Sequence, residues 1–480
     1  MTPPRPRTTT LPLLVVLLIL LAACQTNPPA PTNPPATPPR TTQPASQPPT
    51  QAPTPSSTPV IEPPVLPIDI FGTGTLTPTV SLNTLTLFGY TYQQPDGNRF
   101  VEGQGNLLNL EATVIPLEGL PRWVVGGPID GNGSIWAVVL EDGRVQGFML
   151  LEGRLAPLDI FPQQLAPGQP PLLIIDRGVP SLVTAPSPQA STLTHPVVLS
   201  VDPLRMAFIE NNGDLVLWEN GEIGRLALNA LPDARILQDE NDRLLLLTDA
   251  TTRYTHAVLG DDLEAGSISL VATNPALELV WTLPLPDNRV VEGIAPIWTD
   301  LDGNGEREII VTASDEENGA QILLFDEQGE QIAAGPAIGR GFRWRHQLLA
   351  APFGPAGKNY LVDVLTPHIG GVVEFYQWVE DRLDILAELP GYSSHKIGSR
   401  NFDMALAGDL DGDAAVELLV PNNEMDALGA LRLANRNITL DWEIQLESLL
   451  TTNLSAVTLQ DGSIAIAMGV DDNRLLIWSP

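Results

Sequence analysis

The sequence contains one cysteine, Cys24, and only two lysines, Lys358 and Lys396, among 480 residues. A single cysteine excludes an internal disulfide. Aromatic residues make up 5% of the chain, and 57 acidic residues against 25 basic ones give a net charge of −32. A surface of this charge repels nucleic acid and anionic lipid headgroups. The composition therefore excludes nucleic-acid partners and favours divalent cations or basic partners.

The sequence also lacks a recognisable catalytic motif. There is no Gly-x-Ser-x-Gly nucleophile elbow, and no two histidines have the i, i+4 spacing of a metal site on a helix. We therefore predict that the protein is not an enzyme, although a glycosidase-type pair of carboxylates remains open because acidic residues are so numerous. Each histidine is interpreted as a core or surface residue. The five histidines are His195, His256, His346, His368 and His395.

The first 23 residues have the features of an export signal. Arg5 and Arg7 precede an apolar stretch over residues 11–23 that is too short to span a bilayer comfortably. The stretch ends in Leu21-Ala-Ala-Cys24, which resembles a bacterial lipobox. The resemblance implies cleavage before Cys24, lipidation of its thiol, and a membrane anchor in the bacterial cell envelope, facing outside the cytoplasm. An ordinary secretory signal with an incidental cysteine is the alternative.

Residues 24–68 differ in composition from the rest of the chain. Sixteen of these forty-five residues are proline, and most of the others are Thr, Ala, Gln and Ser. Such a segment cannot bury enough apolar surface to fold, so it is predicted to be a disordered tether behind the lipidated cysteine. Residues 69–480 are long enough for a large core and are predicted to form one domain.

Two acidic loops, residues 300–308 and 409–417, repeat one pattern: Asp-Leu-Asp-Gly-Asn/Asp, then Glu at position 9 and an apolar run. Side-chain oxygens at positions 1, 3, 5 and 9, with the carbonyl of position 7, can converge on one cation. Calcium takes six to eight oxygens in flexible geometry, which suits this set. Two Asp-Gly turns with solvated carboxylates are the alternative interpretation.

An EF-hand is excluded because position 12 is Val311 in one loop and Val420 in the other, and because the flanks are strand-like. The pattern instead resembles the calcium loops of FG-GAP/VCBS repeats, which form the blades of integrin-α-like β-propellers. The resemblance implies two structural Ca²⁺ sites, and Ala414 departs from it by replacing a glycine. The implied ligands are Asp300, Asp302, Asn304, the carbonyl of Glu306 and Glu308 in the first loop, and Asp409, Asp411, Asp413, the carbonyl of Ala415 and Glu417 in the second.

Short apolar stretches separated by Asp-Gly and Asn-Gly turns predict antiparallel hairpins throughout residues 69–480. In the C-terminal half the hairpins recur about every fifty residues, which favours an all-β fold, a β-propeller of seven or eight blades, over two stacked β-sandwiches. The last strand, 475–478, ends the chain. Residues 80–92 alternate well and are predicted to pair with it, so that N- and C-terminal strands close the ring.

These features predict a surface-exposed, lipid-anchored binding or adhesion protein whose partners are the membrane, through Cys24, and an unknown protein or carbohydrate ligand. An envelope scaffold of a membrane assembly and a polysaccharide-active hydrolase are the alternatives, since propellers carry many activities. The basic and aromatic segment 340–346 is interpreted as an inter-blade strand packing Phe342 and Trp344 inward, or else as a ligand-facing patch.

Overall fold

The computed structural model describes residues 85–256 and 260–480, and all of them belong to one compact unit. The predicted signal peptide, Cys24, the tether and residues 69–84 lie outside the described residues. Within the described part of the chain there is no α-helix, and no helix is long and apolar enough to cross a membrane. The predicted all-β class is confirmed.

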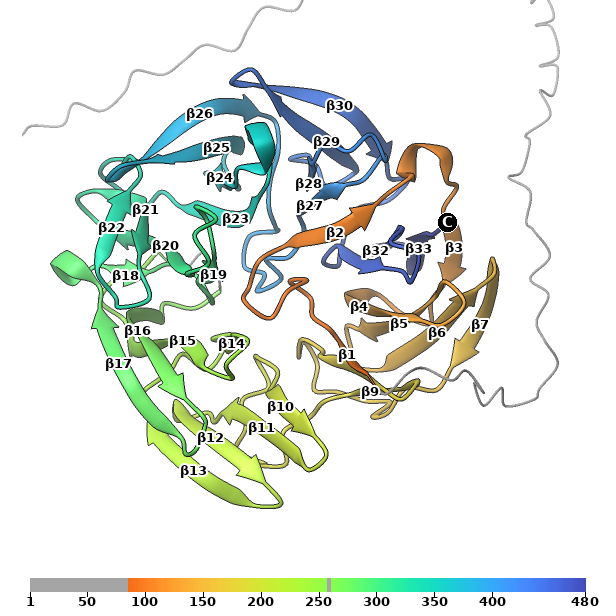
Figure 1. Cartoon of the computed structure of the whole chain (residues 1–480), viewed down its shortest axis with the longest axis horizontal. Coiled ribbons are helices and arrows are strands. Elements are labelled where there is room, and N and C mark those ends of the chain that lie inside the picture. Colours follow the sequence, from red (N-terminus) through yellow and green to blue (C-terminus); the bar gives the residue numbers. More distant parts are fainter. Residues whose placement is uncertain (1–84, 257–259) are drawn as a thin grey trace, which may run out of the picture. The chain divides into compact units, whose positions relative to one another are not determined.

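Hydrogen bonds divide the strands of the described residues into six sheets, which are built mostly from four-stranded antiparallel meanders. These follow one another around a central axis (Figure 1). The first meanders are β4 (Pro121–Ile129), β5 (Gly133–Leu140), β6 (Val145–Leu151) and β7 (Arg154–Leu158); β10 (Val197–Val201), β11 (Leu204–Ile209), β12 (Asp214–Glu219) and β13 (Glu222–Ala227); and β14 (Leu237–Gln238), β15 (Leu244–Thr251), β16 (Glu264–Ala272) and β17 (Glu278–Pro284).

The third meander continues through β18 (Val290–Val291), which pairs with both β16 and the later strand β20, into two further meanders of the same sheet. Another meander follows. These three are β19 (Ile297–Thr299), β20 (Glu308–Asp315), β21 (Gly319–Phe325) and β22 (Gln331–Ala334); β23 (Arg345–Ala351), β24 (Tyr360–Leu365), β25 (Val372–Val379) and β26 (Arg382–Pro390); and β27 (Leu406–Asp409), β28 (Glu417–Pro421), β29 (Ala427–Ala434) and β30 (Asn437–Gln445).

Two sheets combine strands from distant parts of the sequence. One holds β31 (Ser455–Thr458), β32 (Ile464–Val470) and β33 (Arg474–Trp478) with β3 (Thr113–Pro116), and the other holds β1 (Thr86–Gly89) with β8 (Leu173–Asp176) and β9 (Val179–Leu182). β2 (Phe100–Gln104) pairs in parallel with β27. Residues 85–256 and 260–480 also contain three short 3₁₀ turns: η1 (Leu107–Asn109), η2 (Pro286–Asn288) and η3 (Pro355–Gly357).

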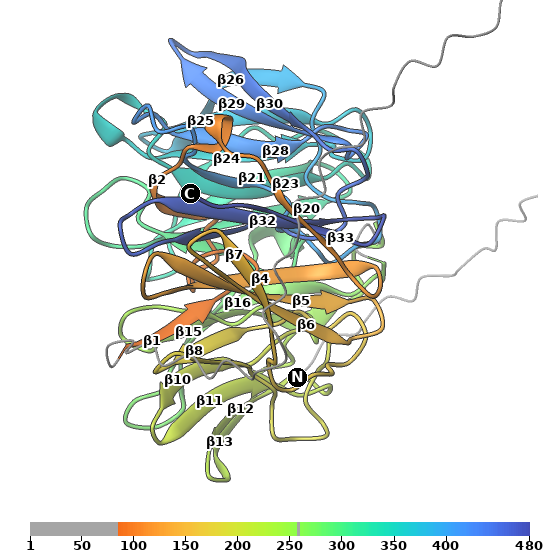
Figure 2. The same cartoon turned by 90° about the vertical axis from the view of Figure 1, so that its right-hand side faces the viewer.

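The position of a strand within its meander determines its sequence pattern. Every residue of β5, Gly-Ser-Ile-Trp-Ala-Val-Val-Leu, is buried, since both faces of its sheet pack against neighbouring sheets. The outer strand β30 alternates and is mostly exposed. Continuous apolar runs are typical of strands covered on both faces, and alternation of apolar and polar residues is typical of strands with one face exposed to solvent. The facing sides of adjacent sheets therefore form the core. Figure 2 shows these sheets stacked on one another.

The segment between β1 and β2 runs through the centre of the ring (Figure 1). Its side chains contact several sheets: Asn98 Nδ2 donates to the carbonyl of Ala350 at 2.9 Å, and Arg99 Nε donates to Asp403 at 2.8 Å. Asp403 also accepts from Arg235 Nη1 at 2.8 Å. Arg99 and Asp403 are 5% and 0% exposed, so this charge cluster is shielded from water. The N-terminal part of the domain thus fills the middle of the fold.

The prediction for residues 80–92 is wrong in its partner. The described part of that stretch forms β1, which pairs with β8, with Thr86 opposite Asp176. β3 pairs with the C-terminal strand β33 instead, with Ile115 opposite Leu475. An alternating sequence is compatible with any sheet edge that is covered on one face, so it does not identify the partner strand. Ile115 of β3, by contrast, is 3% exposed and belongs to the same apolar cluster as Trp136. Packing beneath the strand decides the partner, and alternation does not.

Candidate metal centre

The two acidic loops occupy the same place in two meanders. The first joins β19 to β20, and the second joins β27 to β28, so each links the innermost strand to the next. In each loop the carboxylate oxygens of positions 1, 3 and 9 lie within 4.8 Å of one another. These residues are Asp300, Asp302 and Glu308 in the first loop and Asp409, Asp411 and Glu417 in the second. The loops can therefore hold a metal ion.

Backbone N–H groups wrap the first carboxylate of each loop in the same way. Asp300 accepts from the N–H of Gly303 at 2.6 Å and of Gly305 at 2.8 Å. Asp409 accepts from Gly412 at 2.8 Å and from Ala414 at 3.1 Å. Two loops 109 positions apart with one hydrogen-bond pattern are two copies of one local fold.

Positions 5, 7 and 9 are also fixed by local hydrogen bonds. Asn304 Oδ1 accepts from the N–H of Glu306 at 2.6 Å, as Asp413 Oδ1 does from Ala415 at 2.9 Å. The position-5 side chain thus holds the backbone that carries the predicted carbonyl ligand. At position 9, Glu308 Oε2 accepts from Leu301 N–H at 2.7 Å, and Glu417 Oε2 from Leu410 N–H at 2.9 Å.

The position-9 glutamates are the buried members of each loop. Burial, together with the neighbouring carboxylates Asp302 and Asp300, raises the pKa of Glu308 to about 7. Burial likewise raises the pKa of Glu417 to about 7. Desolvation and like charge both disfavour the ionised form, and a bound cation would reverse that preference.

The loops differ in one neighbouring side chain. In the second loop the guanidinium of Arg432 bonds to Asp413 at 2.7 Å and to Glu417, and lies 3.4 Å from Asp411. Arg432 follows Leu431, which pairs with Leu418. A cation of the protein itself therefore already balances the second loop.

The first loop has no such arginine at the matching position. Asp326 follows Phe325, which pairs with Ile309, so it corresponds to Arg432, and its carboxylate caps its own turn by accepting from Glu330 N–H at 2.8 Å. The neighbouring Arg307 bonds elsewhere, to Asp96 and Glu240, both at 2.9 Å. The carboxylates of the first loop are left without a cationic partner among the described residues.

Ala414 also distinguishes the second loop. It has a φ of +68°, in the left-handed region where the first loop has Gly305 at +92°. A residue with a Cβ is strained there, so the departure from the repeat pattern carries a conformational cost. The fold nevertheless keeps the turn geometry.

Four of the five histidines, each interpreted from the sequence as a core or surface residue, lie close to aromatic or ionisable neighbours at one place. His368 Nε2 lies 3.2 Å from His395 Nε2, and the His346 ring centroid lies 5.5 Å from that of His395. Trp344 stacks on His346 at 5.0 Å. His256 bonds to the buried Glu292.

These histidines lie at the end of the meanders opposite the acidic loops, because β27 begins after His395 and ends at Asp409. Burial lowers the pKa of His368 to about 4 and those of His346 and His395 well below the usual value. The sequence contains no motif that groups these histidines. His346 and His395 lie at the starts of two meanders and His368 lies in a turn, so only the arrangement of the meanders around the ring brings them together.

The two aromatic residues of segment 340–346 differ in burial, and each agrees with a different one of the two interpretations given from the sequence. Trp344 is 2% exposed and donates its indole N–H to the carbonyl of Glu292 at 2.9 Å, which agrees with inward packing. Phe342 is 44% exposed and stacks on His256 at 5.4 Å. The prediction of two inward aromatic rings is therefore right for Trp344 and wrong for Phe342.

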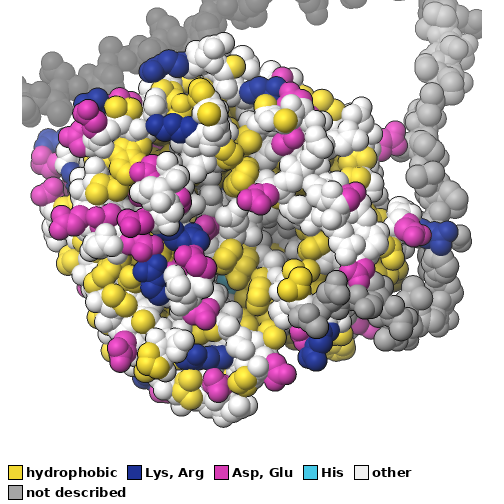
Figure 3. All heavy atoms as spheres, viewed as in Figure 1, with side chains coloured by type: hydrophobic (Ala, Val, Ile, Leu, Met, Phe, Trp, Pro, Cys, Tyr) yellow, Lys and Arg dark blue, Asp and Glu magenta, His cyan; other side chains and the backbone are white. Residues whose placement is uncertain are grey.

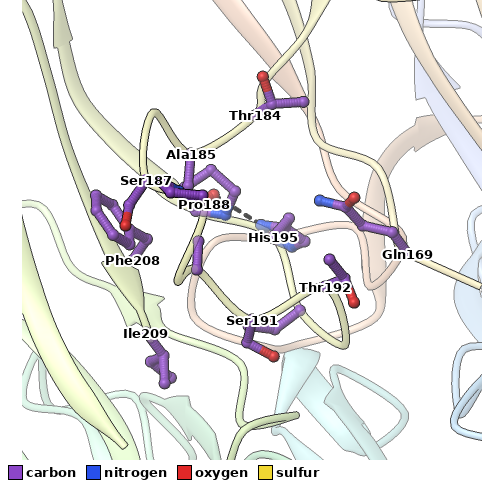
Figure 4. A pocket seen from close by; sticks show the side chains of 13 residues that line it. Gln169, Thr184, Ala185, Ser187, Pro188, Ser191, Thr192, His195, Phe208 and Ile209 are labelled. Carbon is purple, nitrogen blue, oxygen red and sulfur yellow. Dashed lines mark hydrogen bonds between the residues drawn. The ribbon is translucent and has the colours of Figure 1, made fainter. Parts of the chain in front are cut away.

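A separate cavity of about 180 Å³ lies beside His195 (Figure 4). His195 donates from Nδ1 to the carbonyl of Pro196 at 2.8 Å and stacks on Tyr92 at 5.8 Å. The cavity is lined mainly by small residues and by residues with Ser or Thr hydroxyls, such as Ser187 and Ser191. This volume is below that of typical organic-ligand sites, which begin at about 300 Å³.

Charge on the visible face is mixed. Acidic side chains are spread across the face seen in Figure 3, with Lys and Arg between them and apolar patches near the middle. This face carries no broad basic area of the kind that binds nucleic acid.

No protein-family model matches the sequence, and no curated protein matches it. Several solved structures are similar. A europium-containing methanol dehydrogenase matches with a TM-score of 0.52 at 11% identity, over 82% of this chain and 98% of that one. BamB from Moraxella catarrhalis matches with a TM-score of 0.37 at 12% identity, over 79% and 97%. The dehydrogenase is a β-propeller, and at this identity the likeness shows the fold alone: the chain has a β-propeller fold.

Proposed function

We propose that the protein is a lipid-anchored, calcium-stabilised β-propeller of eight blades that binds a ligand at the bacterial cell surface. Six four-stranded meanders, the β1–β8–β9 sheet and the β3–β31–β32–β33 sheet support the count of eight. Pairing of β3 with β33 supports closure of the ring by strands from both ends of the domain. An edge paired in this way cannot recruit a strand from another chain.

The calcium proposal is carried by one observation: three carboxylates converge within 4.8 Å in a loop whose backbone pattern occurs twice. The FG-GAP/VCBS resemblance supplies the identity of the ion. The first loop is the stronger site, since no arginine neutralises its carboxylates, and Arg432 weakens the second. Extracellular calcium sites of this kind typically have dissociation constants of about 10⁻⁴ to 10⁻³ M.

The ion would be structural. Calcium binds the folded loop, so it raises the free energy of unfolding with the logarithm of its concentration, by about 2.7 kcal/mol at a hundred times the dissociation constant. The melting temperature rises accordingly. We expect Asp302→Ala to remove most of this stabilisation and Asp411→Ala to remove less. Asp130→Ala is the matched control: Asp130 lies in the loop Asp130-Gly-Asn-Gly133 between β4 and β5, and its carboxylate accepts from Gln460 Nε2 at 2.6 Å. Scanning calorimetry in calcium, magnesium and chelator decides, and equal melting temperatures in all three would contradict the proposal.

The anchor rests on Leu21-Ala-Ala-Cys24 and on the proline-rich residues that follow. A lipidated Cys24 with a tether over residues 24–68 would hold the propeller, residues 69–480, away from the membrane. Wild-type protein should incorporate labelled palmitate and partition into detergent, and Cys24→Ala should do neither. Equal labelling of both proteins would remove the lipoprotein proposal.

We propose binding or adhesion rather than catalysis because the sequence has no nucleophile motif. Glycan and protein arrays probed with the purified protein, once in calcium and once in chelator, test this role. Capture of one ligand class in calcium that is lost with Asp302→Ala would connect binding to the first loop. Hydrolysis of an arrayed glycan would favour the enzyme alternative.

A further inference from the structure

Two histidine side chains meet between two neighbouring meanders. His368 comes from the loop between β24 and β25, and His395 comes from the connection between β26 and β27. Their Nε2 atoms are 3.2 Å apart. His395 is 1% exposed, whereas His368 is only half-buried, so the pair is reachable from solvent on one side.

The separation matches a shared metal ion. Zinc and related ions bind imidazole nitrogen at about 2.0–2.1 Å, so two nitrogens 3.2 Å apart subtend an angle of roughly 103° at the ion, close to tetrahedral. We propose that His368 and His395 bind a divalent transition-metal ion of the zinc class through their Nε2 atoms. Borderline ions of this class prefer imidazole, whereas calcium prefers oxygen, so the site is chemically distinct from the acidic loops.

The rings are held in place by groups behind them. Ser394 Oγ lies 3.3 Å from His395 Nδ1, and Ser393 Oγ donates to the carbonyl of Pro367 at 2.9 Å, which ties the two loops together. Trp344 packs edge-on against His395 at 4.9 Å. Hydrogen bonds to the far nitrogen and packing of this kind orient metal-binding histidines and fix which nitrogen is free.

A third imidazole lies beside the pair. His346 is 4% exposed, its ring centroid is 5.5 Å from that of His395, and its Nδ1 has no hydrogen-bond partner among the described residues. A buried polar atom without a partner is costly, so a water bound in this part of the fold would stabilise it. Two histidine ligands leave two tetrahedral positions open, which suits water or a carboxylate group of an external ligand.

The competing interpretation is a direct N–H···N hydrogen bond between two neutral rings, which needs no ion. Zinc titration of the full-length protein separates the two. The protein is purified in detergent with a histidine-free tag, stripped with chelator, and titrated by calorimetry at pH 7 in millimolar calcium. We expect one zinc ion per chain, and a further zinc-dependent rise in melting temperature at a calcium concentration that is already saturating.

Variants assign the ion to the pair. His368→Gln and His395→Ala should each weaken zinc binding at least tenfold, while His195→Gln, a change at the separate cavity, should not. His368→Gln lies in a half-buried turn, and a circular dichroism spectrum and urea unfolding curve unchanged from wild type in the absence of zinc verify its fold. Cobalt substituted for zinc should give the visible absorption of a tetrahedral site in wild type and His195→Gln, and not in His368→Gln or His395→Ala. No zinc uptake by wild type, or equal uptake by His368→Gln, would overturn the proposal and favour the direct hydrogen bond.

Discussion

At the scale of single residues, one neighbouring side chain changes the charge balance of two loops with the same backbone hydrogen bonds. Arg432 bonds to Asp413 at 2.7 Å and to Asp441 at 2.8 Å, and Asp326 stands at the matching position of the other meander. A guanidinium among carboxylates competes with any added cation because both satisfy the same oxygens. Sites of identical local geometry can therefore differ in affinity through a neighbour on the next strand.

Removing that guanidinium should strengthen the second calcium site. Two unit charges about 4 Å apart near a surface interact by roughly 4 kcal/mol. If removal of Arg432 transfers even part of this energy to calcium, Arg432→Ala should bind calcium in the second loop at least tenfold more tightly. Calorimetry should show two comparable calcium sites in place of one strong and one weak site. Arg474→Ala, at a pair with the exposed Glu447, is the control. Unchanged binding in Arg432→Ala would show that the arginine does not compete.

The pKa of Glu308 predicts how pH affects stability without calcium. Its folded pKa is raised to about 7 from an ordinary value of 4.5, so the folded state holds the proton more tightly than the unfolded state. Stability should therefore fall as pH rises from about 4.5 to 7. In chelator the melting temperature should be lower at pH 7.5 than at pH 5, and saturating calcium should reduce this drop. Glu308→Gln should remove the part of this drop in melting temperature that calcium suppresses. A drop of the same size with and without calcium would contradict the assignment of the pH dependence to Glu308.

At the scale of elements, sequence-distant strands complete sheets that contiguous strands leave unfinished. β3 lies on β33 with four paired residues, although more than 350 positions separate them. Its inward residue, Ile115, belongs to an apolar cluster with Val138 and Ile477. Burial on one face gives this short strand a defined register.

Ile115→Ala should destabilise the protein by about 2–5 kcal/mol, as large-to-small changes in a core do. Val114, in the same strand, is 47% exposed, and Val114→Ala should change stability by less than about 0.5 kcal/mol. Urea unfolding of both variants measures the difference. Equal small effects would show that β3 contributes little to the last sheet.

At the scale of the whole domain, the segment between β1 and β2 connects opposite parts of the ring. Arg99 and Asp403 are 304 positions apart, and both are buried with Arg235. Asp403 keeps a lowered pKa because the two guanidinium groups outweigh its burial. Two arginines sharing one carboxylate hold the central segment against two meanders.

Asp403→Asn should therefore be strongly destabilising, by about 3–5 kcal/mol, because it leaves two buried cations without their counter-charge. Asp472→Asn is the control: Asp472 pairs with Arg474 at 2.7 Å at the surface. Exposed pairs contribute at most about 1 kcal/mol. Guanidinium denaturation measures both, and a loss for Asp403→Asn no larger than that of the control would contradict the account.

Local patterns determined much of this protein from the sequence alone. Hairpins such as β5–β6 and β12–β13, the all-β class and the convergence of Asp300, Asp302 and Glu308 follow from short-range alternation and from loop spacing, because a tight turn fixes residues a few positions apart. Only the tertiary structure decided what long-range packing controls. It placed β3 on β33, drove residues 90–99 through the ring, set Arg432 beside the second loop, and brought His368 to His395. Neighbours across a ring have no fixed sequence separation, so no spacing rule could have found them.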